Sequence, residues 1–173
     1  MSSLIYACPL CQSPLEHKEQ SYRCLNKHSF DIAKQAYVNL LPVQQKNSKD
    51  PGDSKAMLQG RRRFLNQGFY SPLVTAIAEM LKTRQPQSVL DLGCGEGYYA
   101  QMLAEHFAAA DIKTQFFGLD ISKPAIMMAA KTAQVNQQDS QFCIASSFHL
   151  PYLEESLDAV YTIFAPVDLK QLG

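Results

Sequence analysis

The chain has no long hydrophobic run and no secretory leader. None of its apolar stretches approaches the ~20 residues that a bilayer-spanning helix requires, which excludes a membrane span. The first ten residues, MSSLIYACPL, lack a basic segment followed by a long apolar core, so we expect a cytoplasmic protein. Internal repeats and low-complexity segments are also missing. The length of 173 residues fits one domain, or one small and one medium domain.

The chain also lacks net charge, because 16 basic residues balance 16 acidic ones. This balance argues against a strongly basic nucleic-acid-binding protein. It hides an asymmetry, however: residues 1–63 carry a net charge of +5, and residues 64–173 carry −5. The positive charge of the amino-terminal segment, beside a negatively charged remainder, suggests that this segment binds a polyanion.

Only five cysteines are present, and three of them cluster near the start with a histidine. In a reducing compartment such a cluster is typical of a metal site rather than of disulfides. The pattern is C-x2-C-x12-C-x3-H, and its members are Cys8, Cys11, Cys24 and His28. Thiolate and imidazole ligands favour tetrahedral Zn²⁺, and four protein ligands leave no open position, so the site is predicted to be structural.

Other interpretations of these residues stay open. His17 is a second candidate for the fourth ligand, although it lies inside the loop between the two pairs. The competing hypothesis for the whole set is free, buried cysteines. Cys94 and Cys143 lie on or beside predicted strands, and we interpret both as small buried hydrophobic residues.

The chain divides into three predicted segments. Residues 1–35 have too few apolar side chains for a core of their own and need a metal to fold. Residues 36–70 form a connector that is irregular as far as residue 53 and then helical, with Asp53 or Ser54 as the N-cap. Residues 71–173 form the larger domain. It opens with a helix at Ser71-Pro72, whose predicted apolar face consists of Leu73, Ile77, Met80 and Leu81.

Four short apolar runs alternate with helical stretches in the larger domain. The runs are predicted strands at 88–92, 115–120, 141–145 and 158–164. This alternation is typical of α/β proteins and predicts a Rossmann-like, doubly wound parallel sheet, preceded by the small zinc-binding domain. Numbered in chain order, the strands are expected to lie side by side as 3-2-1-4. Because Gly173 follows the last strand closely, we expect the sheet to be incomplete and the chain truncated.

A glycine-rich loop follows the first of these strands and opens a helix. Asp91, Gly93, Gly95 and Gly97 form the pattern D-x-G-x-G-x-G, in which bare backbone amides can meet an anionic ligand. Asp120 ends the second strand, where its carboxylate is predicted to bind ribose hydroxyls. Dinucleotide sites carry a third glycine where this chain has Tyr98. The tighter pattern favours S-adenosylmethionine, whose methionine end would lie on the loop.

Taken together, the chain resembles the bacterial 23S ribosomal RNA guanine-N1 methyltransferases, the large-subunit rRNA methyltransferase A family. The resemblance rests on the metal-ligand set, FDIAKQAYVNLLPVQ (30–44), DPGDSKAMLQGRRRFLNQGFY (50–70), VLDLGCGEGYY (89–99), FGLDISKPAI (117–126) and ASSFHLPY (145–152). It implies a zinc-binding RNA-recognition domain, a catalytic domain and a homodimer that binds an RNA hairpin. It also implies that Tyr70, Gly95, Glu96 and Gly97 contact the cofactor, with Asp120 at its ribose.

The sequence leaves the catalytic residues unknown. Methylation of guanine N1 must remove a proton, and Glu96 and Asp168 are candidate acceptors by location alone, with water as the alternative. Three consecutive arginines, Arg61, Arg62 and Arg63, are candidate phosphate contacts, and three aromatic residues, Phe69, Tyr98 and Tyr99, are candidates for stacking on the cofactor or base. The FAPV stretch (164–167) lacks a polar residue that would hold an exocyclic amine, which favours a ring nitrogen as acceptor.

Two further functions compete with this one. The first is a small-molecule methyltransferase in which the zinc-binding segment only stabilises the fold. The second is a non-catalytic RNA-binding module that retains the pocket.

Overall fold

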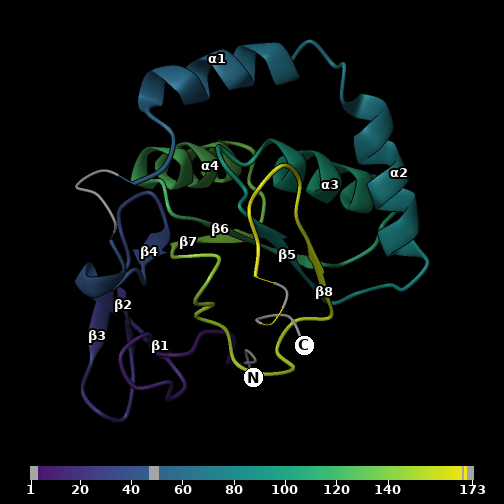
Figure 1. Ribbon diagram of the computed structural model, residues 1–173. Helices are drawn as coiled ribbons and strands as arrows, with labels where there is room; N and C mark the ends of the chain where they lie inside the picture. Colours follow the sequence, from purple (N-terminus) through teal and green to yellow (C-terminus); the bar gives the residue numbers. More distant parts are fainter. Residues whose placement is uncertain (1–3, 47–50, 169, 171–173) are drawn as a thin grey trace.

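The computed structural model describes residues 4–46, 51–168 and 170, and shows two sheets with four α-helices (Figure 1). The small antiparallel sheet consists of β1 (Glu16–Lys18), β2 (Ser21–Arg23) and β3 (Ser29–Asp31). The large sheet consists of β4 (Tyr37–Asn39), β5 (Ser88–Leu92), β6 (Gln115–Asp120), β7 (Ser140–Ile144) and β8 (Ala159–Tyr161). The helices are α1 (Lys55–Leu65), α2 (Ser71–Lys82), α3 (Tyr98–Ala109) and α4 (Lys123–Val135), and a short 3-10 helix, η1, covers Val43–Gln45.

The large sheet confirms the predicted fold class. Its strands are all parallel and lie in the order β4-β7-β6-β5-β8, so the four predicted strands keep their expected order. The prediction of an irregular segment before residue 53 was wrong in one place. There, β4 adds a fifth strand at the edge, where Val38 pairs with Cys143. Three residues are too few for a periodic signal, so this strand depends on the neighbouring β7 for its hydrogen bonds.

The two faces of the sheet are covered by different parts of the chain. Successive side chains of a strand point to opposite faces, and along β5 this sends Leu90 and Leu92 to one core and Val89 to another. Val89 packs with residues of α2 and α3, and both α3 and α4 lie on its side of the sheet (Figure 1). The opposite face is covered by the small sheet and by the segment between β7 and β8.

The front of the chain, residues 4–35, which we call the ribbon, shares its core with the large sheet. Tyr6 and Leu15 are almost completely buried in the same cluster as Leu90 and Phe117. The Tyr6 and Phe117 rings meet edge to face with their centroids 6.5 Å apart. The backbone amide of Ala7 also donates to the carbonyl of Pro151 over 3.0 Å. The ribbon is therefore fastened to the sheet, while the segment boundaries at residues 35 and 70 remain predictions.

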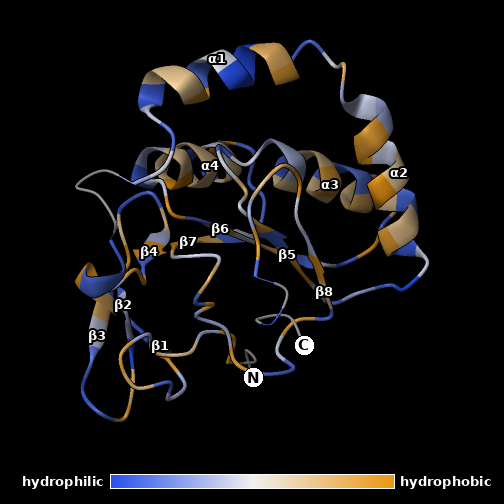
Figure 2. Cartoon of the chain, viewed as in Figure 1, coloured by the Kyte–Doolittle hydropathy of each residue, from blue (hydrophilic) through white to orange (hydrophobic). Residues whose placement is uncertain are grey.

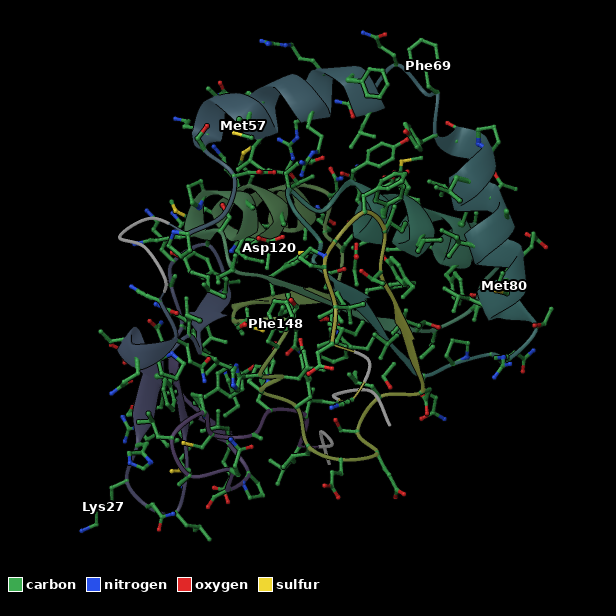
Figure 3. The ribbon with its side chains drawn as sticks, in the orientation of Figure 1. Lys27, Met57, Phe69, Met80, Asp120 and Phe148 are labelled. Carbon is green, nitrogen blue, oxygen red and sulfur yellow. The ribbon has the colours of Figure 1, made fainter. Side chains whose placement is uncertain are left out.

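Helix α1 begins where the sequence predicted, because the Ser54 hydroxyl accepts a hydrogen bond from the Met57 amide. For α2 the predicted apolar face was right for Ile77 and Leu81 and wrong for Leu73 and Met80. The buried stripe is Val74, Ala78 and Leu81, and Met80, although apolar, is 67% exposed and points away from the molecule (Figure 3). In the part of the chain that the structure describes, no helix is long and apolar enough to cross a membrane.

Candidate functional site

The four predicted metal ligands come together at one end of the ribbon. Their ligand atoms all lie within 4.8 Å of one another, and no other such group of His, Cys, Asp and Glu occurs among the described residues. His28 Nδ1 lies 3.5 Å from Cys8 Sγ and 3.4 Å from Cys24 Sγ, and the Cys11 and Cys24 sulfurs are 3.7 Å apart. Zinc–sulfur bonds of ~2.3 Å in a tetrahedron give sulfur–sulfur edges of about 3.8 Å, so the side chains fit Zn²⁺.

Two tight turns build this metal centre. In the first, the Gln12 amide donates to the Cys8 carbonyl over 2.8 Å, and in the second the Lys27 amide donates to the Cys24 carbonyl over 3.0 Å. Hydrogen bonds with Asn26 and Ser13 lower the pKa of Cys11 to about 5, whereas burial raises the pKa of Cys8 to about 11. The alternative ligand His17 lies outside the cluster, with its ring against Tyr22 at 5.3 Å.

The glycine-rich loop forms one wall of a cavity of about 580 Å³, which we call the donor pocket. Of the residues predicted to bind cofactor, those that line it are Tyr70, Gly93, Gly95, Glu96 and Asp120. Asp91 and Gly97 do not line it. Gly97 has a φ of +86° and precedes α3, and a Cβ there would lie 2.8 Å from the Ala129 Cβ of α4, so it serves close packing between the loop and α4.

Asp120 holds the glycine loop in shape. Its Oδ2 accepts a hydrogen bond from the Gly95 amide at 2.9 Å, and its Oδ1 accepts one from the Ser122 amide at 2.8 Å. Burial raises the pKa of Asp120, while these two amides lower it. The carboxylate thus joins the end of β6 to the loop after β5, and it stands in the pocket wall where ribose binding was predicted (Figure 3).

Asp91 lies beneath the loop and is 1% exposed. Burial raises its pKa to about 7, against the lowering effect of the nearby Tyr161 hydroxyl and Ala100 amide. Asp91 Oδ2 and the Tyr161 hydroxyl are close enough to influence each other's protonation, but neither makes a hydrogen bond of normal geometry. The Ala100 contact places Asp91 at the start of α3, where a carboxylate supports the first turn.

Asp91→Asn is expected to change how stability depends on pH. The folded pKa of about 7 exceeds the ordinary value of 3.8, so the protonated form stabilises the fold. That contribution is complete below the ordinary value and is lost as pH rises through the folded value. A shift of this size corresponds to roughly 4 kcal/mol, so between about pH 4 and 7 the melting temperature of the unsubstituted chain should fall relative to that of Asp91→Asn. The exposed Glu105→Gln is the control and should follow the unsubstituted chain at every pH. The prediction would be contradicted if the melting temperatures of Asp91→Asn and of the unsubstituted chain changed with pH in parallel.

Two of the three arginines of α1 have partners within the chain, whereas Arg63 is exposed, and the prediction that they contact phosphate stays a prediction. Arg62 Nε donates to Glu96 Oε2 over 3.3 Å, and its Nη2 donates to the Thr132 hydroxyl over 2.6 Å. Arg61 forms an ion pair of 2.7 Å with Asp53 and lines the donor pocket. Figure 2 shows the hydrophilic middle of α1 that carries them. Arg62 therefore joins α1 to the glycine loop and to α4, whereas Arg61 pairs with Asp53 just before α1.

The remaining predicted residues divide between the pocket and the surface. Tyr98 and Tyr99 line the donor pocket and are mostly buried. Phe69 lies outside it and projects from the turn between α1 and α2 (Figure 3). Asp168 also lies outside it, and its Oδ1 accepts a hydrogen bond from the Lys170 amide.

Sequence reasoning missed several residues of the pocket wall. Asp53, Ser146, Phe148 and Ala165 line it but were not predicted to do so, and Phe164 entered only as part of FAPV. Most of them follow β7 or β8. Parallel strands end at one edge of the sheet, so the segments after β7 and β8 could have been assigned to the pocket from the predicted strand order.

Comparison with known proteins assigns both parts of the chain. Residues 6–49 match the family described as RlmA, N-terminal, a zinc ribbon, and residues 89–171 match the family described as methyltransferase domain. The chain is 35% identical over 128 residues to the 23S rRNA (guanine(748)-N(1))-methyltransferase of Streptomyces fradiae, covering 72% of this chain and 43% of that protein. The chain belongs to the RlmA family.

A second RlmA-type relative covers nearly the whole chain. It is YxjB of Bacillus subtilis, named as a 23S rRNA (guanine-N(1)-)-methyltransferase, with 31% identity over 173 residues, which is 94% of this chain and 57% of that protein. The chain thus spans about half the length of the curated relatives it matches.

The fold is shared with a solved structure from Methanococcus maripaludis, described as an S-adenosylmethionine-dependent methyltransferase. Its TM-score is 0.55 at 19% identity, over 69% of this chain and 55% of that one. At this level of identity the likeness shows the methyltransferase fold alone.

Proposed function

We propose that this chain supplies the donor-binding and RNA-recognising half of a cytoplasmic 23S rRNA guanine-N1 methyltransferase. The observation that carries the proposal is the donor pocket, formed by a methyltransferase-type glycine loop, Asp120 and Tyr70 in a chain that also carries an RlmA-type ribbon. The names of the Streptomyces and Bacillus relatives support the choice of 23S rRNA and of guanine N1.

The pocket residues divide the task of binding S-adenosylmethionine. The amides of Gly93 and Gly95 suit the methionine end, and Asp120 suits the ribose. When bound, the cofactor supplies a methyl group on a positively charged sulfur. The chain positions donor and acceptor for an in-line displacement, because orientation contributes most to such a transfer. In the ribbon, Cys8, Cys11, Cys24 and His28 would hold a structural Zn²⁺.

Each carboxylate in the described pocket wall already has a partner. Asp53 pairs with Arg61, Glu96 pairs with Arg62, and Asp120 accepts two amide hydrogen bonds. Burial raises the pKa of Glu96, and Arg62 lowers it. Of the two acceptors considered for the guanine N1 proton, Glu96 is thus engaged and Asp168 lies outside the pocket. These contacts favour water over either carboxylate as the acceptor of the proton.

The ribbon rather than α1 meets the RNA backbone in this proposal. Arg62 is committed to an ion pair with the buried Glu96, whereas the ribbon exposes basic side chains at Lys18, Arg23, Lys27 and Lys34, of which Lys18 pairs with the exposed carboxylate of Glu16. Phosphate contacts of this kind make binding weaken steeply with salt. Binding of an RNA hairpin by a homodimer remains a prediction.

The proposal predicts methyl transfer to guanine in unmethylated 23S rRNA. The chain, and the chain extended by the carboxyl-terminal part of the Bacillus relative that it does not cover, would be incubated with this RNA and labelled S-adenosylmethionine, and the label mapped. Label at guanine N1, lost in Asp120→Ala, is the expected result. Label on adenine or cytosine, or RNA-independent methylation of small molecules, would refute it. Absence of donor binding by calorimetry would favour a non-catalytic RNA-binding module.

A further inference from the structure

Exposed phenylalanines gather at the mouth of the donor pocket. Among the described residues four phenylalanines are exposed, and three of them, Phe64, Phe148 and Phe164, line the pocket. They come from α1, from the segment after β7 and from the segment after β8. Apolar rings that converge on one opening mark a binding surface, because scattered exposed residues would not meet.

Phe164 is the most exposed of the three, at 83%, and its backbone is strained. Its φ is +57°, and it is the sole aromatic residue among the described non-glycine residues with positive φ. A bulky side chain in this conformation costs of order 1–3 kcal/mol, and strain of this kind gathers at functional sites.

The next residue prevents this strain from relaxing. Ala165 packs so closely on the glycine loop that a Cβ at Gly93 would lie 2.3 Å from the Ala165 Cβ. Figure 1 shows the segment after β8, in yellow, rising to this position beside α3 and α4. The Tyr70 ring then meets the Phe164 ring edge to face, with centroids 5.9 Å apart and planes at 84°. Phe164 is therefore held outward beside the donor loop.

The position of the Phe164 ring indicates which kind of ligand binds there. The pocket lining combines the glycine loop and Asp120 with the exposed rings of Phe64, Phe148 and Phe164. The methyl acceptor must reach the donor past exposed side chains, so a permanent cover over these rings would hinder its entry. A planar nucleobase that binds reversibly suits these rings, since bases stack on aromatic side chains.

The geometry points to Phe164 as the residue on which an extruded guanine stacks, with Tyr70 supporting the ring; this inference rests on the proposed function. Enzymes that modify a base take it out of the RNA stack and hold it between flat side chains. Stacking on Phe164 would present the edge of the base to the donor. Ala165 and Pro166, which follow, offer no side-chain hydrogen bond to an exocyclic amine, so a ring nitrogen is the suitable acceptor.

The chain contains no tryptophan, which permits a direct test. Phe164→Trp introduces a single fluorophore at the proposed stacking position, and Phe69→Trp introduces one at an exposed position outside the pocket. With S-adenosylhomocysteine present, each variant is titrated with a guanine-containing RNA hairpin and with guanosine monophosphate. We expect guanine to quench the fluorescence of Phe164→Trp and to leave that of Phe69→Trp unchanged. Equal quenching of both variants, or none while RNA is bound, would overturn the inference.

A second measurement does not depend on the fluorophore. Phe164→Ala should weaken RNA binding about tenfold or more and Phe164→Tyr should restore it, whereas Phe69→Ala, at an exposed position outside the pocket, should leave RNA binding unchanged. Unchanged RNA affinity in Phe164→Ala would overturn the stacking role. Failure of the unsubstituted chain to bind donor or RNA would instead remove the proposed function, so the two failures are distinguishable.

Discussion

His28→Ala is expected to release the metal from the ribbon and to unfold it. Structural Zn²⁺ contributes on the order of 10 kcal/mol in small domains, and a site reduced to three ligands loses most of that contribution. The loss should reach the large sheet, because Tyr6 and Leu15 share a core with Leu90 and Phe117. We expect a much lower melting temperature, loss of bound zinc, and fast amide hydrogen exchange across the ribbon and along β5.

His17→Ala is the matched control for this experiment, because it removes a histidine from the same segment outside the cluster. It should retain one zinc per chain and nearly all of the stability. Chelation of the unsubstituted chain should reproduce the effect of His28→Ala. The structural role would be disproved by a chain that melts unchanged after its metal has been removed and the removal verified.

Asp120→Ala is expected to abolish useful binding of S-adenosylmethionine and also to destabilise the loop. The substitution leaves the buried amides of Gly95 and Ser122 without a partner, at a cost of about 1–3 kcal/mol each. It also removes the carboxylate proposed to bind ribose, whose hydrogen bonds are worth roughly tenfold to a hundredfold in affinity. Calorimetric titration with the cofactor measures the second effect, and thermal melting measures the first.

Asp168→Ala provides the comparison, since Asp168 lies outside the donor pocket and contacts only the nearby Lys170 amide in the described structure. Its affinity for the cofactor should equal that of the unsubstituted chain. Retention of full affinity in Asp120→Ala would show that the ribose binds elsewhere. In that case the carboxylate would serve only to hold the loop.

The metal-ligand set and the glycine loop could be predicted from the sequence because each is defined by residues close together in the chain. The metal ligands lie in two turns of four and five residues, so their spacing alone predicts that each pair can share an ion. The loop from Asp91 to Gly97 follows a buried strand directly, and the sequence pattern already requires a tight turn there. The spacing within each motif is local, although the distant Asp120 holds the glycine loop in shape through the Gly95 amide.

The partners of individual side chains could not be predicted from the sequence. Arg61, Arg62 and Arg63 look alike in sequence, yet Glu96 and Thr132 lie 34 and 70 residues beyond Arg62. The same holds for α2, where the exposed Met80 and the buried Val74 are both apolar, and the position of α3 decides which of them is covered. Whether a given side chain is buried or paired depends on which other element packs against it.

The sequence by itself determined the parallel order of the four predicted strands, the metal-ligand set and the place of the glycine loop. Periodicity, turn residues and ligand spacing are patterns of a few neighbouring residues, so they can be recognised without knowledge of the fold. Only the tertiary structure decided that β4 joins the sheet, that Arg62 pairs with Glu96 of the glycine loop, and that Phe164 lines the pocket with an exposed ring. These features arise from contacts between segments far apart in the chain, whose free energy no local pattern records.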